Sequence, residues 1–335
     1  MLLNPKQSRV VYEAAFKNHF ALLAVNADSS AAITDCLEAA RICQSPVIIE
    51  TSLWQLQGHS FGAGNPITGL ARYIAQIAVL AADPRYADIP VILHADHISG
   101  PDTFRILEAA IQGIPMPLGE SSHRLHASSI SVDPSILSTD ENIAMISHLC
   151  EVAEHSKNEL TLEVGATEHT HITPLNEAVH LLSSVEKMQP GYVALWSPSL
   201  GARQRLGLPR SINFSSQSVR EHCSIACQST GRPTGIALHS AAGLSEKELH
   251  EAVHAGVVKV NWASESLRIR SSAAIEYYYA QSEVLKPGHH DFAMKAMDNG
   301  LQMWIAQAYV PKLCELIETL GARNQAVTCW RALNL

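Results

Sequence analysis

Two histidines and an aspartate stand within four positions where a short apolar run ends. In the stretch PVILHADHISG, the apolar residues lead directly into His94, Asp96 and His97. Imidazole and carboxylate groups carry protons near neutral pH and also bind metal ions. A further histidine, His239, closes the later apolar run GIALH. If the fold brings both runs to one place, His97 and His239 could reach the same metal ion, and a catalytic zinc would need a third protein ligand.

The elements that must position these groups alternate regularly along the chain. Short apolar runs, which we interpret as strands, alternate with segments whose apolar residues recur at helical spacing. Strands are predicted over 20–26, 46–50, 89–94, 128–133, 160–164, 192–197, 235–239 and 257–261. Helices are predicted over 29–44, 66–82, 101–113, 138–157, 176–188, 245–256 and 266–281. Ser138 with Glu141 and Ser245 with Glu248 form capping boxes that mark two helix starts.

Eight strands that alternate with helices predict an α/β fold in which a parallel sheet closes into a (β/α)8 TIM barrel. Continuous Val, Ile and Leu runs are typical of strands that are buried on both faces. The competing open, doubly wound sheet usually has a glycine-rich first turn, which AVNADSS lacks. We expect a single domain over 1–335 with C-terminal helices at about 290–322. Polar residues end the predicted strands, where a barrel carries its active site.

Composition excludes several classes of partner. The chain has 335 residues, of which 47% are apolar and 17% charged, and its formal net charge is −8. This acidic balance argues against nucleic acid or an anionic membrane as the main partner. The sequence lacks an apolar stretch long enough to span a bilayer and lacks a signal-peptide core. Seven scattered cysteines without a CxxC pair indicate reduced thiols, and we expect a cytoplasmic protein.

The order and spacing of the segments from about residue 8 to 320 resemble the class II, metal-dependent fructose-bisphosphate/tagatose-bisphosphate aldolases. PVILHADH carries the most specific match, and further matches lie in FALLAVN, SPVIIETS, SSISVDPSILSTDENI, LTLEVG, IALHSAAGLSEKEL and GVVKVNWASESLR. The resemblance implies an aldolase-type carbon–carbon lyase that acts on a ketose or ketose phosphate through an enediolate. It also implies a divalent metal ion, with zinc as the first candidate, and a homodimeric assembly.

The resemblance further implies roles for individual residues. His97 and His239 would bind the metal, with Glu163 as a further ligand, while Asp96 and His171 would be catalytic acid/base groups. Substrate-binding roles fall on Asn26, Ser52, Asp133, Gly201, Arg203, Arg205, Ser240, Gly243, Asn261 and Ser264. Of these, Asp133 could also orient a metal-bound histidine. Main-chain N–H groups at 240–243 could cradle an anionic group of the substrate.

The chain departs from the family pattern at the metal site. The family usually has a third histidine ligand before a glycine after the sixth strand, and Leu200 takes that position before Gly201. A leucine side chain cannot bind a metal ion. His171, His169 or Glu163 is therefore expected to supply the third ligand.

The predicted phosphate site departs from the family as well. Small residues, Ala241 and Ala242, replace two glycines of the phosphate loop, and Arg203 and Arg205 flank the position of the family's phosphate-binding lysine. Arginine grips a carboxylate or phosphate in a fork that lysine cannot form. Three functions stay open: a lyase with a rewired site, a metal-dependent epimerase or condensing enzyme on the same barrel, and a non-catalytic, aldolase-like binding subunit.

Overall fold

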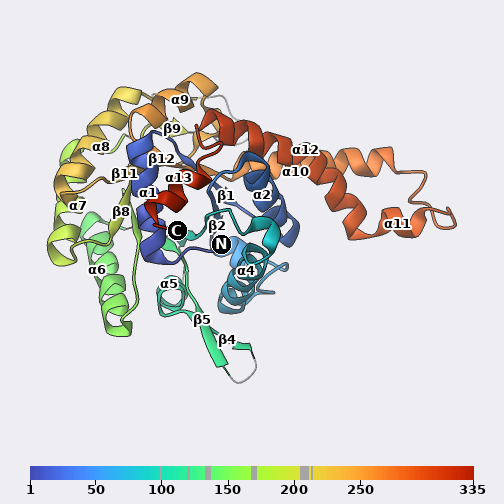
Figure 1. Ribbon diagram of the computed structural model, residues 1–335, viewed down its shortest axis with the longest axis horizontal. Helices are drawn as coiled ribbons and strands as arrows, with labels where there is room; N and C mark the ends of the chain where they lie inside the picture. Colours follow the sequence, from blue (N-terminus) through green and yellow to red (C-terminus); the bar gives the residue numbers. More distant parts are fainter. Residues whose placement is uncertain are drawn as a thin grey trace.

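Eight parallel strands close into a barrel surrounded by helices in the computed structural model, which describes residues 1–98, 100, 102–118, 121–132, 137–166, 172–203, 211–212 and 214–335 (Figure 1). Around the barrel the strand order is β1-β12-β11-β8-β7-β6-β3-β2. The strands are β1 (Leu22–Asn26), β2 (Val47–Thr51), β3 (Val91–Ile98), β6 (Ser129–Val132), β7 (Leu162–Gly165), β8 (Val193–Ser197), β11 (Gly235–Leu238) and β12 (Val257–Trp262). The predicted (β/α)8 barrel is confirmed.

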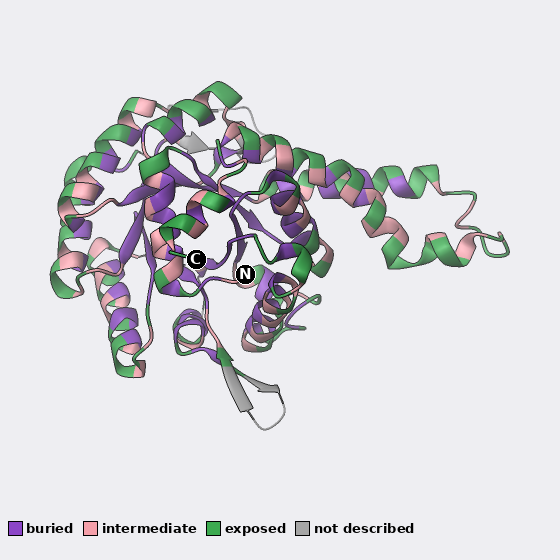
Figure 2. Ribbon diagram, viewed as in Figure 1, coloured by how far each residue is buried: buried purple, intermediate pink, exposed green. Residues whose placement is uncertain are grey.

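Strand residues are buried on both faces, as the continuous apolar runs indicate. Every residue of β1, β2, β8, β11 and β12 is buried, and Figure 2 shows the barrel wall as a buried layer beneath half-exposed helices. One side of each strand fills the barrel interior and the other packs under the helices. Polar side chains inside this wall are therefore held rigidly and kept away from bulk water.

The helices follow the strands in the order of a βα barrel. They are α1 (Pro5–Asn18), α2 (Ser30–Cys43), α3 (Leu53–Gln57), α4 (Pro66–Ala81), α5 (Thr103–Gln112), α6 (Thr139–Ser156), α7 (Leu175–Met188), α8 (Ser216–Thr230), α9 (Glu246–His254), α10 (Ser264–Ala280), α11 (Phe292–Ala296), α12 (Asp298–Thr319) and α13 (Ala326–Ala332). Short 3-10 turns lie at η1 (Pro84–Tyr86) and η2 (Ala241–Gly243). Both predicted capping boxes form, at Ser138 with Glu141 and at Ser245 with Glu248. In the described part of the chain, no helix combines the length and the apolar character needed to cross a membrane.

The N-terminal segment closes the end of the barrel where the strands begin. Leu3 donates its N–H to the Val91 carbonyl at the start of β3, 2.8 Å away. The Ser8 hydroxyl in α1 donates to the Ser128 carbonyl just before β6, at 2.7 Å. The Thr161 hydroxyl just before β7 donates to the Pro5 carbonyl at 2.6 Å. With this end covered, the opposite end of the barrel is the one open to a substrate.

Two further parts extend from the barrel. A hairpin of β4 (Ile114–Leu118) and β5 (Ser121–Leu125) precedes β6. His123 lies in β5, which pairs antiparallel with β4. Helices α10 and α12 run away from the barrel together, with α11 at the far end of this arm (Figure 1). A short antiparallel pair, β9 (Ala202–Arg203) and β10 (Ser211–Ile212), lies between β8 and α8.

Candidate active site

The side chains at the open end of the barrel converge on one point. Asp96 and His97 come from β3, Glu163 from β7, and His239 follows β11 directly. Each of these four residues offers one ligand atom, and all four atoms lie within 4.8 Å of one another. The structure thus brings together the three predicted metal-binding residues and the predicted acid/base Asp96 from three separate strands.

A distortion of β3 lets two adjacent residues face the same site. In a regular strand, neighbouring side chains point to opposite faces, so Asp96 and His97 could not both point into the barrel mouth. The pairing of β3 with β6 shifts register between Ala95 and Ile98, and His97 has a positive φ of 40°. The His97 N–H donates to the Ser131 hydroxyl at 2.7 Å, which holds this conformation. Such irregularities re-aim side chains and are concentrated at functional sites.

The two imidazoles lie face to face beside the Glu163 carboxylate. The ring centroids of His97 and His239 are 4.2 Å apart, with 25° between the ring planes. His239 Nε2 is 2.8 Å from Glu163 Oε1, and His97 Nε2 is 3.7 Å from the same oxygen. Imidazole and carboxylate donors at this spacing suit a divalent transition metal. The residues present therefore fit the cation that the sequence predicts.

A lysine lies buried beneath this cluster. Lys259 Nζ in β12 is 2.8 Å from Glu163 Oε2, 3.2 Å from Glu50 Oε2 and 3.6 Å from Asp96 Oδ1. The Lys259 side chain is fully buried, as are those of Glu50 and Glu163. A buried ammonium surrounded by carboxylates stays charged: burial favours the neutral amine, but the three carboxylates outweigh it and raise the pKa of Lys259. Sequence reasoning missed this residue.

The pKa values of the three carboxyl groups around Lys259 are shifted in different directions. Burial favours the protonated acid at all three. For Glu163, Lys259 and hydrogen bonds from His239 and His97 outweigh burial and hold the pKa well below its usual range. For Asp96, Lys259 and then the imidazoles likewise lower the pKa. For Glu50, burial and then the Asp96 charge raise the pKa well above its usual range. Asp96 is therefore ionised and able to accept a proton.

Two amide side chains hold the Asp96 carboxylate in place. Asn261 Nδ2 donates to Asp96 Oδ1 at 3.0 Å, and Asn26 Nδ2 donates to Asp96 Oδ2 at 3.3 Å. Asn26 Nδ2 also donates to Glu50 Oε1 at 2.8 Å. Both asparagines were predicted to bind substrate, and the structure places them against the catalytic candidate. Each oxygen of Asp96 thus has a fixed hydrogen-bond donor.

Ser52 is linked to the site through Gln55. The Ser52 hydroxyl donates to Gln55 Oε1 at 2.6 Å, and Gln55 Nε2 donates to Asn26 Oδ1 at 3.2 Å. Gln55 is buried at the first turn of α3 and was not singled out from the sequence. The contact predicted between Ser52 and substrate stays a prediction.

His94, the first histidine of the quoted motif, lies inside the barrel below the cluster. Its Nδ1 is 2.8 Å from the Ser129 hydroxyl, and its Nε2 is 3.5 Å from Glu163 Oε2. Burial, and then the Lys259 charge, lower the pKa of His94 to about 3. His94 is therefore neutral at physiological pH, and it packs between Ser129 and the carboxylates.

A cavity of about 190 Å³ opens beside these groups. It is lined by Asn26, Asp96, His239, Ser240, Ala241, Asn261, Ala263 and Ser264. The predicted substrate-binding residues Ser240 and Ser264 thus face the same space as Asp96 and His239. Gly243 ends η2, the turn that follows Ser240, and Ser240 itself has a positive φ of 59°.

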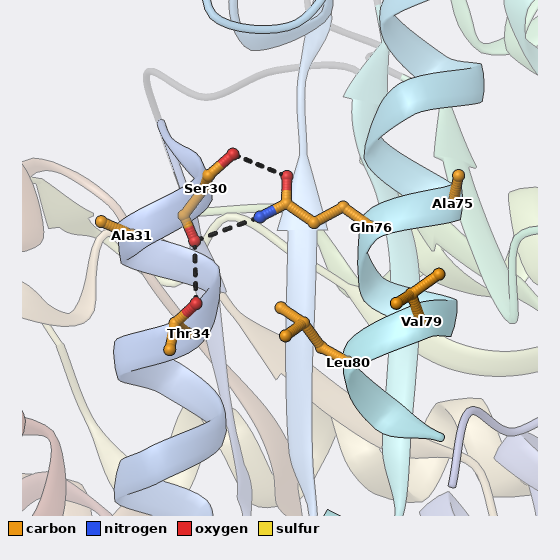
Figure 3. Close-up of a pocket in the computed structure, with 7 residues that line it drawn as sticks. All are labelled: Ser30, Ala31, Thr34, Ala75, Gln76, Val79 and Leu80. Carbon is orange, nitrogen blue, oxygen red and sulfur yellow. Dashed lines mark hydrogen bonds between the residues drawn. The ribbon is translucent and has the colours of Figure 1, made fainter. Parts of the chain in front are cut away.

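A larger hollow of about 450 Å³ lies on the outer surface between α2 and α4 (Figure 3). Ser30 and Gln76 bridge it, with 2.8 Å between Ser30 Oγ and Gln76 Oε1, and the remaining lining is mainly apolar. None of its lining residues carries a titratable group. The barrel mouth, and not this hollow, holds the groups that can do chemistry.

The structure describes only some of the other predicted residues. Asp133, His169, His171 and Arg205 fall outside the described residues. The backbone of Arg203 ends β9, and Gly201, with a positive φ of 73°, precedes that strand. Leu200 is buried in the hydrophobic core with 3% of its surface exposed, so its side chain serves packing at the position where the family has a histidine.

The chain matches known proteins over nearly its whole length. The family model "Fructose-bisphosphate aldolase class-II" matches residues 6–310. Fructose-bisphosphate aldolase 1 of Paracoccidioides lutzii is 27% identical over 319 residues, which cover 86% of this chain and 80% of the relative. Fructose-bisphosphate aldolase class 2 of Buchnera aphidicola is 24% identical over 314 residues, covering 85% and 84%.

Solved structures share the fold. The fructose-bisphosphate aldolase of Campylobacter jejuni superposes with a TM-score of 0.80 at 18% identity, over 96% of both chains. The YdjI aldolase of Escherichia coli superposes with a TM-score of 0.69 at 17% identity, over 97% of this chain and 100% of the other.

Proposed function

This chain belongs to the class II fructose-bisphosphate aldolase family, whose members are metal-dependent aldehyde-lyases, and from this premise we propose that it cleaves a ketose or ketose phosphate with a rewired metal and anion site. The observation that carries the proposal is the convergence of Asp96, His97, Glu163 and His239 within 4.8 Å at the barrel mouth. A cation held by His97 and His239 supplies Lewis acidity toward a ketose carbonyl. Zinc suits these ligands, and the third ligand is predicted from His171, His169 or Glu163.

Asp96 is the proposed base for carbon–carbon cleavage. It is ionised, lines the cavity and is held by Asn26 and Asn261. Its role is to accept the proton of the hydroxyl group next to the breaking bond. That carbon becomes the aldehyde, while the electron pair of the broken bond passes to the fragment that bears the carbonyl. A second acid/base group, predicted at His171, returns a proton to that fragment, which balances the reaction.

The anion site is proposed from polar groups around the cavity. The hydroxyl-bearing residues Ser240 and Ser264 line it, and Arg203 and Arg205 are the predicted cationic groups for a phosphate or carboxylate of the substrate. We further propose that the protein is a cytoplasmic homodimer. Light scattering of the purified protein would measure the oligomeric state directly.

Metal analysis of the purified protein, combined with His97→Ala, tests the proposed function. We expect close to one zinc ion per chain in the parent protein and loss of that metal in His97→Ala, with a melting temperature near that of the metal-free parent. A panel of ketose phosphates and free ketoses would then be followed for triose release. A parent protein that binds no divalent metal would contradict the proposal, whereas epimerised ketose without triose would support the epimerase alternative.

A further inference from the structure

The two oxygens of the Glu163 carboxylate are bound to different partners. Lys259 Nζ lies 2.8 Å from Oε2, and His239 Nε2 lies 2.8 Å from Oε1. The Glu163 side chain is fully buried. Glu163 is not among the residues that line the cavity, whereas His239 is. Glu163 therefore lies behind His239 as seen from the space that a substrate would enter.

These contacts fix which nitrogen of His239 carries hydrogen. A carboxylate in a buried ion pair with an ammonium is ionised, and an ionised carboxylate can only accept hydrogen bonds. The hydrogen shared between Glu163 Oε1 and His239 must therefore sit on Nε2, and Nδ1 keeps its lone pair. Nδ1 is 3.4 Å from Asn261 Nδ2, another group of the cavity lining. The lone pair of His239 is thus on the cavity side of the ring.

We propose that Lys259, Glu163 and His239 form a positioning chain, in which Lys259 fixes the carboxylate and the carboxylate fixes His239 with the Nδ1 lone pair turned toward the cavity to bind the metal. The inference rests on the proposed function, because it assigns roles at the same metal site. Metal-binding histidines almost always donate their other ring N–H to a carboxylate, a carbonyl or water, which orients the ring. Glu163 then acts through His239 instead of binding the metal itself.

Two residues of this chain gain roles that the aldolase resemblance alone does not give them. Lys259 becomes a positioning residue. It does not line the cavity, and its ammonium group contacts the carboxylates of Glu50, Asp96 and Glu163. Glu163 is removed from the possible third ligands. The third ligand must then come from His169, His171 or water.

Metal titrations of the full chain test the proposal. Zinc and cobalt affinities would be measured against a competing chelator for the parent protein, Lys259→Met and Glu163→Gln. We expect all three to bind one metal ion per chain. Both variants should bind it about 10- to 100-fold more weakly, the usual effect of losing a group that orients a ligand.

Nitrogen-15 NMR of the imidazoles reports the tautomer directly, in a way that general destabilisation would not imitate. In the metal-free parent, His239 should carry its hydrogen on Nε2. In Lys259→Met the Nε2–H population should fall, because the carboxylate loses its fixed position. Arg270→Met is the matched control: it also removes a buried cation, which pairs with Asp35 at 2.6 Å outside the cluster, and should leave both metal affinity and tautomer unchanged.

The outcomes separate this inference from the proposed function. A parent protein without metal would overturn the proposed function. A parent that binds metal, with Lys259→Met unchanged in affinity, would overturn the positioning chain alone. So would complete loss of metal in Glu163→Gln, which would make Glu163 a direct ligand. If Lys259→Met fails to fold, the metal affinities of Lys259→Arg and Glu163→Gln test the proposal instead. Lys259→Arg should bind the metal within a few-fold of the parent affinity. An equal loss of metal affinity in both variants would refute the positioning chain.

Discussion

Replacing Asp96 by asparagine removes the proposed base while keeping its size and shape. Both oxygens of Asp96 accept hydrogen bonds, from Asn261 at 3.0 Å and from Asn26 at 3.3 Å. The amide of Asp96→Asn offers only one oxygen, so its NH2 group must face one of these donors. Leaving a buried donor without an acceptor costs about 1–3 kcal/mol. The variant should therefore be less stable than the parent by that amount but still folded.

The effect on catalysis should be larger than the effect on stability. General base catalysis contributes about 10²- to 10⁴-fold to a rate, which corresponds to roughly 2.7–5.4 kcal/mol of barrier at 1.36 kcal/mol per tenfold. We expect kcat/KM for triose release to fall by this factor in Asp96→Asn. Its metal content should match that of the parent, because Asp96 is not a proposed ligand.

Glu50→Gln provides a matched control for this measurement. It makes the same carboxyl-to-amide change beside Lys259, at a group that lies 3.2 Å from the same ammonium but has no proposed part in proton transfer. Glu50 also does not line the cavity. We expect Glu50→Gln to retain activity within about tenfold of the parent, a loss of less than 1.4 kcal/mol of transition-state stabilisation. If zinc-loaded, folded Asp96→Asn were as active as Glu50→Gln, the assignment of Asp96 as the base would be wrong.

Four other outcomes follow from the structure. Removal of zinc by a chelator should abolish triose release and lower the melting temperature by several degrees in calorimetry, since a ligand at 100 times its Kd stabilises by about 2.7 kcal/mol; an unshifted melt would contradict a bound ion. Arg270→Ala breaks the buried ion pair with Asp35 at 2.6 Å and should lower the free energy of unfolding, measured in urea, by about 3–5 kcal/mol. Replacing an exposed arginine by alanine should change this free energy little. Gly69→Ala would place a methyl group 1.9 Å from the Leu56 carbonyl oxygen, so about 1–3 kcal/mol of overpacking is expected in the same assay. Ser138→Ala removes the N-cap of α6 and should lower stability by about 1 kcal/mol, with Ser138→Asp near the parent.

The sequence predicted the barrel because its signal is repeated and strong. Strands buried on both faces read as apolar runs, and all eight were found with ends shifted by a few residues. The main shift is at β3, which continues to Ile98, because the polar residues of HADH face the barrel interior and the run of apolar letters stops before the strand does. Helices α1 and α8 were not predicted as elements, since neither follows directly from a strand run.

The site could be predicted in part, and Lys259 shows why one of its residues was missed. Apolar letters do not show which face of a strand points into the barrel. In VVKVN, Lys259 stands two positions before Asn261, so both lie on the same strand face. Since Asn261 was expected in the site, Lys259 could have been placed inside the barrel beneath it. Glu163 and His97 were found, but the distortion of β3 that turns His97 toward them has no sequence signature.

The buried ammonium and its three carboxylates also limit how this protein can change. Replacing Lys259 alone leaves buried carboxylates without their cation, and replacing one acid alone alters the charge balance for the others. Apart from the shape-conserving change Glu50→Gln, single substitutions at these positions should therefore give mostly inactive clones. New specificities are better sought at Ser240, Ala241, Ala263 and Ser264, which face the cavity, while the interior quartet is either kept intact or randomised together.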